Sequence, residues 1–275
     1  MASHSHSDKV ATFRSLHVPG RPLLMPNPWD QGSARLLLSL GFQALATTSS
    51  GFAATLGRLD GSVTRDEALA HAASIVGAVD APVSADLENG FADDPDAVAE
   101  TAAGARAAGL AGFSIEDFTG DQGSPIYEPR QATERVAAAA EAAHRSGDTG
   151  LVLTGRAENL LHGVRDLADT IARLQAYQEA GADVLYAPGL TDLADIRQVV
   201  TSVDCPVNVL ALPGGPTISE LAEAGVRRVS VGSAFAFAAL GALVEAATEL
   251  REQGTYGFGA LSAVGRAAVR EAFAG

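Results

Sequence analysis

Short apolar segments rich in valine, isoleucine and leucine recur along the chain, and each is followed by a longer amphipathic stretch. The short segments have the length of buried strands, and the longer stretches have the spacing of helices. Eight strands are predicted, at residues 22–25, 44–48, 82–86, 112–116, 150–154, 183–187, 206–210 and 228–231. They recur about every 29 residues, which is the size of one βα unit.

The ends of the predicted helices favour a closed parallel barrel. Glycines precede four of the strands and can take the left-handed conformation that ends a helix: Gly41, Gly109, Gly181 and Gly225. Several strand segments are apolar throughout, which is typical of parallel strands covered on both faces. We therefore predict a TIM-type (β/α)8 barrel of the α/β class. A doubly wound open sheet is the second choice. That fold normally has a glycine-rich dinucleotide-binding turn after its first strand, and residues 27–30 read Asn-Pro-Trp-Asp at that place.

The barrel is expected to form a single domain over residues 16–275, and the polar leader at residues 1–15 is predicted to be disordered. After the eighth strand the pattern predicts two further helices, at residues 235–253 and 258–273. The second helix is surplus to an eight-unit barrel, and its apolar face needs a partner. An oligomer contact is the expected partner.

Composition and charge narrow the classes of function. The chain has 275 residues and a formal net charge of −14. Such an acidic protein binds a phosphate backbone poorly, so we expect neither nucleic acid nor an anionic membrane as a partner. The longest uncharged apolar run, residues 231–244, is too short to span a bilayer. No signal segment opens the chain, so a cytoplasmic location is expected.

Two scarce residue types exclude several kinds of chemistry. Cys205 is the only cysteine, so an internal disulfide, a cysteine-based zinc site and a CxxC redox pair are excluded. Lys9 is the only lysine, and it lies in the polar leader. Schiff-base aldolase and pyridoxal phosphate chemistry both need a buried lysine amine, and both are effectively excluded.

Acidic residues gather where the strands of a barrel end, which is where its active site lies. Asp60, Asp86, Glu88 and Glu116 belong to successive units. Crowded carboxylates repel one another unless they are protonated or bridged by a cation. An oxygen-rich set without cysteine or paired histidine suits Mg2+, with Mn2+ as the other possibility. The alternative is that some of these acids cap helices; Asp86 and Glu116 end strands, which favours function.

Other polar residues at the same end are further candidates. Arg156 is either a salt-bridge partner for the acids or a clamp for a substrate carboxylate. His162 follows the fifth strand closely enough to be an acid/base candidate. Residues 213–216 and 232–233 lie where many barrels bind phosphate, although simple turn formation is the preferred explanation.

Several motifs, in this order and over roughly residues 18–254, resemble those of the isocitrate lyase/phosphoenolpyruvate mutase superfamily. They are Asn27-Pro28-Trp29-Asp30, Gly32-Ser33-Ala34-Arg35, Ser50-Gly51, Asp86-Leu87-Glu88, Ile115-Glu116-Asp117 and Gly155-Arg156-Ala157-Glu158. The resemblance implies a barrel whose last helix is exchanged between the subunits of a homodimer or homotetramer. It also implies an enzyme that forms a pyruvate enolate while a C–C or P–C bond breaks.

The resemblance further assigns residues to the site. It implies Mg2+ held mostly through water by Asp60, Asp86 and Glu116. A 2-oxo or 2-hydroxy carboxylate would be held by the backbone at residues 50–52 and by Arg156. Substrate binding is accordingly expected of Ser50, Gly51, Phe52, Asp86, Arg156 and Asn208, and catalysis of Arg156, Glu116 and His162.

Departures from the superfamily pattern restrict the reaction. Many relatives have an aspartate where this chain has Ser84, so Glu88 is expected to compensate at the metal. Lyases that act on isocitrate or methylisocitrate carry an acid cysteine after the fourth strand, whereas residues 118–129 contain no Cys, Lys or His. Those lyases also have polar residues after the strand-seven asparagine, while Asn208 precedes an apolar run.

The expected function is therefore that of a Mg2+-dependent carbon–carbon lyase or decarboxylase acting on a small 2-oxo or 2-hydroxy (di)carboxylate. Decarboxylation of oxaloacetate fits best, because departing CO2 needs no general acid. Cleavage of a substituted malate or of methylisocitrate is close behind, with Tyr127, Tyr186 or His162 as proton donor. The alternatives are phosphonopyruvate hydrolase or phosphoenolpyruvate phosphonomutase, a non-catalytic 2-oxo acid binder, and a sugar-phosphate barrel enzyme.

Overall fold

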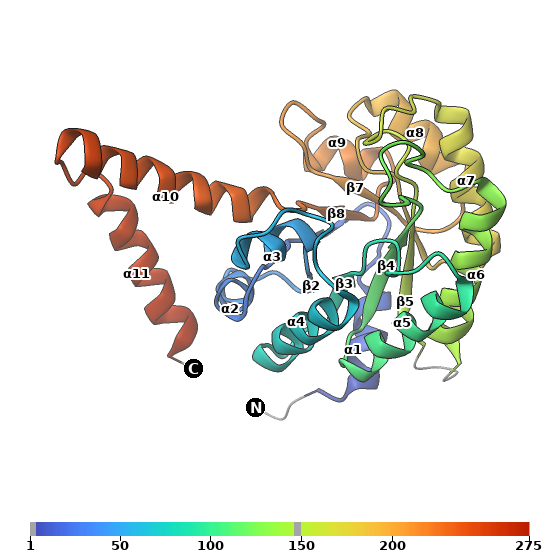
Figure 1. The fold of residues 1–275 in the computed structure, drawn as a ribbon, viewed down its shortest axis with the longest axis horizontal. Coiled ribbons are helices and arrows are strands. Elements are labelled where there is room, and N and C mark those ends of the chain that lie inside the picture. Colours follow the sequence, from blue (N-terminus) through green and yellow to red (C-terminus); the bar gives the residue numbers. More distant parts are fainter. Residues whose placement is uncertain (1–3, 146–149, 275) are drawn as a thin grey trace.

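An eight-stranded parallel sheet, rolled into a nearly closed barrel, forms the centre of the protein in a computed structural model that describes residues 4–145 and 150–274 (Figure 1). The strands are β1 (Leu23–Met25), β2 (Leu45–Ala46), β3 (Val83–Asp86), β4 (Gly112–Glu116), β5 (Val152–Arg156), β6 (Val184–Tyr186), β7 (Val207–Leu210) and β8 (Arg228–Ser230). Hydrogen-bonded neighbours follow the order β1-β8-β7-β6-β5-β4-β3-β2. The predicted barrel is confirmed, and each predicted segment overlaps its strand.

Helices alternate with the strands and cover the outside of the barrel (Figure 1). They are α2 (Gln31–Ser39), α3 (Ser49–Thr55), α4 (Arg65–Ala78), α5 (Pro95–Ala107), α6 (Pro129–His144), α7 (Leu167–Glu179), α8 (Leu193–Thr201) and α9 (Ile218–Glu223). Side chains cap most of their N-termini by accepting backbone N–H groups, as Asp94 does for α5, whereas α6 begins with a proline and has no such cap. The four glycines predicted to end helices all have positive φ, between 79° and 104°.

A buried asparagine joins the two edge strands of the sheet. Asn27 follows β1, and its Nδ2 donates to the carbonyl of Thr47 after β2, at 3.0 Å. Its Oδ1 accepts the amides of Val231 and Gly232 after β8, at 3.1 and 2.9 Å. One amide side chain therefore holds together three strand ends that would otherwise leave unpaired backbone groups.

The N-terminal segment is not a disordered leader, and that expectation is wrong for the described residues 4–15. Residues His6–Ser15 form helix α1, which begins with a capping box between Ser5 and Asp8. Val10 and Phe13 are buried, and the Phe13 ring lies against Gly112 at the start of β4. Helix α1 thus covers the N-terminal ends of the strands and belongs to the barrel domain.

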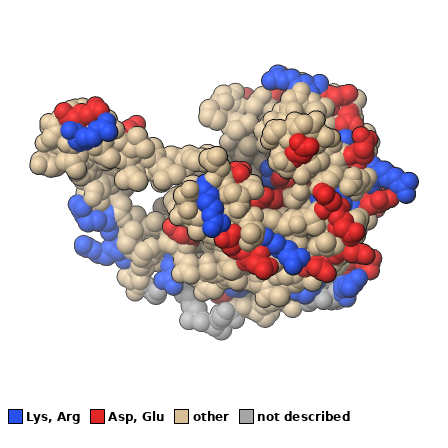
Figure 2. Space-filling view, viewed as in Figure 1, with Lys and Arg blue, Asp and Glu red and all other residues tan. Residues whose placement is uncertain are grey.

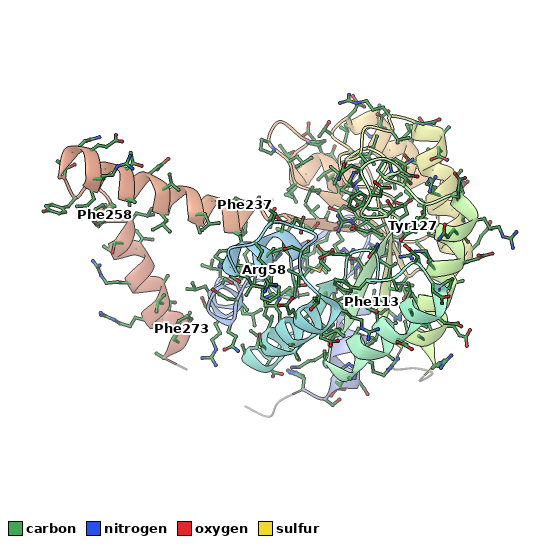
Figure 3. All side chains as sticks on the ribbon, viewed as in Figure 1. Arg58, Phe113, Tyr127, Phe237, Phe258 and Phe273 are labelled. Atoms are coloured by element: carbon green, nitrogen blue, oxygen red, sulfur yellow. The ribbon has the colours of Figure 1, made fainter. Side chains whose placement is uncertain are left out.

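Two helices at the C-terminal end form an arm that leaves the barrel (Figure 1). They are α10 (Ala234–Gln253) and α11 (Gly259–Phe273), close to the predicted ranges. The aromatic side chains of the arm are spread along it in Figure 3, and Phe273 approaches Gly32 of α2. In Figure 2 the middle of the arm is largely uncharged. Even α10, the longest of the described helices, lacks the apolar character of a membrane span.

Replacement of Phe13 by alanine tests whether α1 is part of the folded domain. Because the ring is fully buried, Phe13→Ala is expected to lower the free energy of unfolding by about 3–5 kcal/mol. Thr12→Ala, on the exposed face of the same helix, is expected to change it by less than about 0.5 kcal/mol. Urea denaturation followed by circular dichroism measures both values. Equal effects would show that α1 does not pack on the barrel.

Replacement of Asn27 by alanine tests the junction of the strand ends. The variant leaves two amides and one carbonyl without their partner, so we expect a loss of about 3 kcal/mol in unfolding free energy. Gln43→Ala removes an exposed amide side chain and is the matched control. Denaturant titration of both variants gives the comparison. A loss no greater than that of the control would contradict the joining role.

Candidate active site

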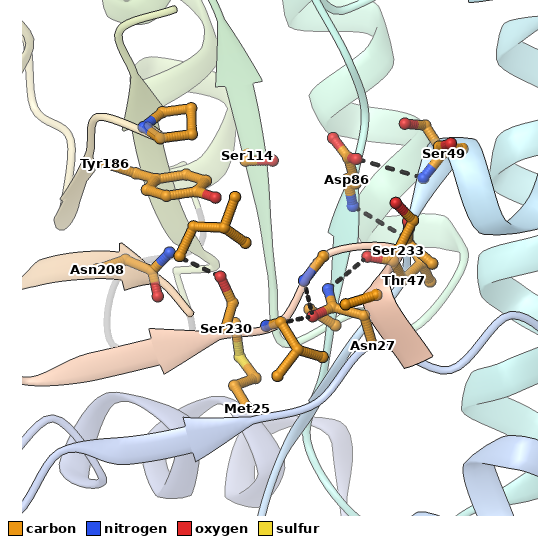
Figure 4. A pocket seen from close by; sticks show the side chains of 18 of the residues that line it. Met25, Asn27, Thr47, Ser49, Asp86, Ser114, Tyr186, Asn208, Ser230 and Ser233 are labelled. Carbon is orange, nitrogen blue, oxygen red and sulfur yellow. Dashed lines mark hydrogen bonds between the residues drawn. The ribbon is translucent and has the colours of Figure 1, made fainter. Parts of the chain in front are cut away.

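A cavity of about 350 Å3 opens at the carboxyl ends of the strands and reaches into the barrel (Figure 4). Its lining residues come from the strands and from the loops that follow them. The polar ones include Asn27, Thr47, Ser49, Ser50, Asp60, Ser84, Asp86, Ser114, Thr154, Arg156, Tyr186, Asn208, Arg228 and Ser230. The interior of a TIM-type barrel is normally filled by bulky branched side chains, whereas small hydroxyl side chains leave space here.

Arg156 at the end of β5 lies at the centre of an ion-pair cluster. Its Nη1 is 3.3 Å from Asp86 Oδ1 and 3.2 Å from Glu116 Oε2. Its Nε donates to Glu158 Oε1 at 2.5 Å. The guanidinium also lies 5.2 Å from the centre of the Tyr186 ring. One cation therefore faces three carboxylates in a partly water-excluded wall, where such interactions are strong.

Negative charge exceeds positive charge around this arginine. Burial raises the pKa of Glu116 well above its usual value, although Arg156 opposes the shift. Burial, together with Asp86 and Asp60, raises the pKa of Glu88 to about 8. Glu88 also has a φ of 48°, an unfavourable backbone conformation for a residue other than glycine. The surplus charge must be neutralised by protons or by a cation.

The four acids predicted to bind a metal do not form one set of direct ligands. Across residues 4–145 and 150–274, no three His, Cys, Asp or Glu side chains are grouped closely enough to hold an ion between them. Asp60 and Asp86 line the cavity, Glu88 lines a small recess behind it, and Glu116 contacts Arg156. The surplus of carboxylate charge fits a hydrated divalent ion held largely through water.

The predicted carboxylate cradle at residues 50–52 is only partly present. Ser50 lines the cavity. The amides of Gly51 and Phe52 instead donate to Thr48, the residue that caps helix α3. The Phe52 ring stacks on His71, with 3.8 Å between ring centres. These two residues therefore support the loop, and neither lines the main cavity as expected.

The three candidate proton donors occupy different places. The His162 ring stacks on Phe118, 4.0 Å between centres, and does not line the cavity. The Tyr127 hydroxyl donates to Asp93, and burial raises the pKa of Tyr127 to about 12. Only Tyr186 is a cavity residue, and burial raises its pKa to about 12 as well. The expected roles of His162 and Tyr127 therefore lack support from the geometry.

A second layer of residues holds the Arg156 cluster in place. Asp117 is buried and accepts the amide of Glu158 at 2.7 Å. Its other oxygen accepts the Tyr177 hydroxyl at 2.6 Å and Nη1 of Arg173 at 3.2 Å. The side chain of Asp117, the residue after β4, therefore links the segment after β5 to helix α7.

Sequence reasoning missed the deepest polar residues of the cavity. Arg228 at the start of β8 donates to Asn208 Oδ1 and to Thr154 Oγ1, each at 3.0 Å. Asn208 was expected at the site, and the structure places it there. The alternation of Arg228, Val229 and Ser230 was the available signal, because residues two apart in a strand share a face.

The chain is similar to enzymes of one family along most of its length. The family model for phosphoenolpyruvate phosphomutase matches residues 13–251. The 2-methylisocitrate lyase of Escherichia coli K12 is 31% identical over 234 residues, which cover 77% of each chain. An oxaloacetate decarboxylase of Pseudomonas putida GB-1 is 29% identical over 252 residues, covering 87% of this chain and 84% of that protein.

Solved structures give the same result. A Burkholderia cenocepacia J2315 protein provisionally described as a lyase/mutase is 52% identical, with a TM-score of 0.88 and coverage of 92% and 91%. A 2,3-dimethylmalate lyase is 30% identical, with a TM-score of 0.81 and coverage of 94% and 90%. A phosphonopyruvate hydrolase in complex with oxalate and Mg2+ is 25% identical, with a TM-score of 0.79 and coverage of 90% and 88%. Together with the family match, these similarities show that the chain is an enzyme of the phosphoenolpyruvate mutase/isocitrate lyase superfamily.

Proposed function

We propose that this enzyme is a Mg2+-dependent lyase or decarboxylase that acts on a small 2-oxo or 2-hydroxy dicarboxylate through an enolate. Loss of CO2 from a 2-oxo diacid forms the pyruvate enolate, and cleavage of a 2-hydroxy acid to pyruvate forms the enolate of the departing carboxylate. The position of Arg156 carries the proposal. Its guanidinium at the cavity wall suits a substrate carboxylate, and the carboxylates around it suit a divalent cation next to that substrate. Its relatives include 2-methylisocitrate lyase and oxaloacetate decarboxylase, which agrees with this class of reaction.

The charged and polar residues in and beside the cavity have separate roles in this proposal. Arg156 and Ser50 bind the carboxylate next to the reacting carbonyl, and Arg156 also stabilises the charge of the enolate. Asp86 and Asp60 hold a divalent ion through water, while Glu116 and Glu88 add negative charge close by. When bound, the ion supplies Lewis acidity at the carbonyl oxygen of the substrate. Asn208 orients the remainder of the substrate.

The lack of a conventional general acid favours decarboxylation. Residues 118–128 contain no Cys, Lys or His, and His162 and Tyr127 are held by other contacts. Loss of CO2 needs no proton on the leaving group, and Tyr186 is placed in the cavity to donate a proton to the enolate. Cleavage of a substituted malate is the next candidate: Tyr186 can protonate the enolate of the departing carboxylate, and a cavity carboxylate such as Asp86 would take the proton of the hydroxyl that becomes the pyruvate carbonyl.

Pyruvate release tests the proposed reaction. Oxaloacetate, phosphonopyruvate, 2-methylisocitrate and dimethylmalate are each supplied with Mg2+ or with EDTA, and pyruvate is detected by a coupled dehydrogenase. We expect EDTA-sensitive turnover, greatest with oxaloacetate. Arg156→Gln is expected to lower kcat/KM by about 100- to 1,000-fold, because a charged donor to the enolate is lost. Arg130→Gln changes the charge equally on an exposed side chain and serves as the control.

The outcomes separate the alternatives. Pyruvate from phosphonopyruvate alone would assign a phosphonopyruvate hydrolase. Oxalate binding without any product would favour a phosphonomutase, which need not release pyruvate, or a non-catalytic binder. Either result would contradict the carbon–carbon lyase assignment.

We also propose that the arm of α10 and α11 joins subunits of a homodimer or homotetramer. Its apolar side chains include Phe237, Leu243 and Val244, which are 50–64% exposed. Such a surface in one chain calls for a protein partner. Leu243→Asp is expected to shift the mass in light scattering toward the monomer, whereas Leu40→Asp, outside the arm and 71% exposed, leaves the mass unchanged. A monomeric wild-type protein would contradict this proposal.

A further inference from the structure

Arg228 is a buried cation on the wall of the cavity formed by β7 and β8. Its side chain is almost completely buried, with 3% of the residue exposed. Nε donates to Asn208 Oδ1 and Nη2 donates to Thr154 Oγ1. Nη1 has no hydrogen-bond acceptor among the residues that the structure describes. All the atoms that hold this guanidinium are uncharged.

No described carboxylate compensates the charge of Arg228. Burial lowers the pKa of Arg228 to about 10, and the one neighbouring group that opposes this shift is the Tyr186 phenol. On the α1 side, burial and then Arg228 lower the pKa of His17 to about 4, so His17 is neutral at pH 7. Arg156 and Arg173, by contrast, both contact carboxylates. Burying an unpaired cation is costly, so its retention indicates a use for the charge.

The hydrogen bonds from Arg228 run in one direction toward the cavity. A guanidinium can only donate, so the Asn208 oxygen must face Arg228 and its amide nitrogen must face away. Nδ2 of Asn208 then donates to Ser230 Oγ at 2.9 Å. Ser230 Oγ accepts this bond and keeps its own hydrogen as a donor, with the Tyr186 phenol as its described neighbour. Asn208, Ser230 and Tyr186 lie together at one side of the cavity in Figure 4.

The two sides of the cavity are therefore electrostatically opposite. The side formed by β2–β4 contributes the carboxylate of Asp86 at the end of β3 and that of Asp60, which lies between β2 and β3. The side formed by β7 and β8 contributes a cation and hydrogen-bond donors. Apart from the position beside Arg156 that the proposed function gives to the first carboxylate, an anionic group is repelled by the first side and attracted by the second.

We propose that Arg228, Asn208 and Ser230 form a second anion subsite, which binds the distal carboxylate of a dicarboxylate substrate. Asn208 and Ser230 donate to that carboxylate, and Arg228 acts as a positioning residue that orients Asn208 and supplies the positive potential. This subsite rests on the proposed function for the location of the first carboxylate at Arg156. It selects a diacid over a monoacid with the same 2-oxo or 2-hydroxy head.

An isosteric substitution separates binding at this subsite from folding. Asn208→Asp gives Arg228 a carboxylate partner in place of the amide, so the melting temperature is expected to stay equal or rise. The new negative charge neutralises the subsite and repels an anion. In titration calorimetry with Mg2+, we expect affinity for malate to fall at least tenfold and affinity for lactate, which lacks the distal carboxylate, to change less than threefold.

Further variants complete the test. Arg228→Gln is expected to weaken malate binding in the same way, with partial recovery in Arg228→Lys. Gln43→Glu adds the same charge as Asn208→Asp on an exposed position and should change neither ligand's affinity. Equal losses for malate and lactate in Asn208→Asp would overturn the subsite. So would wild-type protein that binds malate no more tightly than lactate.

Calorimetry also keeps this inference distinct from the proposed reaction, because it needs no turnover. Selective loss of malate binding without pyruvate release from any substrate would retain the subsite and contradict the reaction. Pyruvate release together with equal losses for malate and lactate would retain the reaction and contradict the subsite.

Discussion

The ion pairs of Arg156 are the interaction around which the cavity is organised. They bring together the carboxylates of Asp86 on β3, Glu116 on β4 and Glu158 after β5, at one end of the barrel. Acids so close together would repel one another without the shared cation. Because one cation faces three anions, the cluster retains negative charge and can accept a divalent ion. The same interaction thus stabilises the cluster and leaves it suited to the metal and the substrate that we propose.

This polar cavity is compatible with a stable fold because apolar packing lies elsewhere. Serine and threonine side chains such as Ser84, Ser114 and Thr154 line the interior. The main apolar core lies between the strands and the surrounding helices and includes Phe113, labelled in Figure 3. Helix α1 adds Phe13 at the opposite end of the barrel. Function and stability are therefore placed at opposite ends of the strands, as is usual for this architecture.

The residues that resemble the superfamily motifs and the residues particular to this chain lie in different parts of the site. Arg156, Asp86 and Glu116 belong to the motifs by which the sequence resembles the superfamily. The loop after β4 carries no cysteine, lysine or histidine, so it offers none of these side chains as a proton donor. The unpaired Arg228 at the β7 and β8 wall then becomes a feature that can distinguish substrates. A reaction needing little acid catalysis and a diacid substrate would use both features.

Features that depend on neighbours in the chain could be predicted from the sequence alone. Strand and helix positions, glycine helix ends and the carboxylates after β3 and β4 follow from local periodicity and spacing. Which side chains meet followed only from the folded structure. It gave Phe13 a place beside Gly112, brought Asp86 and Glu116 to Arg156, and left Arg228 without a carboxylate. These outcomes depend on contacts between residues far apart in the chain, and local patterns contain no information about such distances.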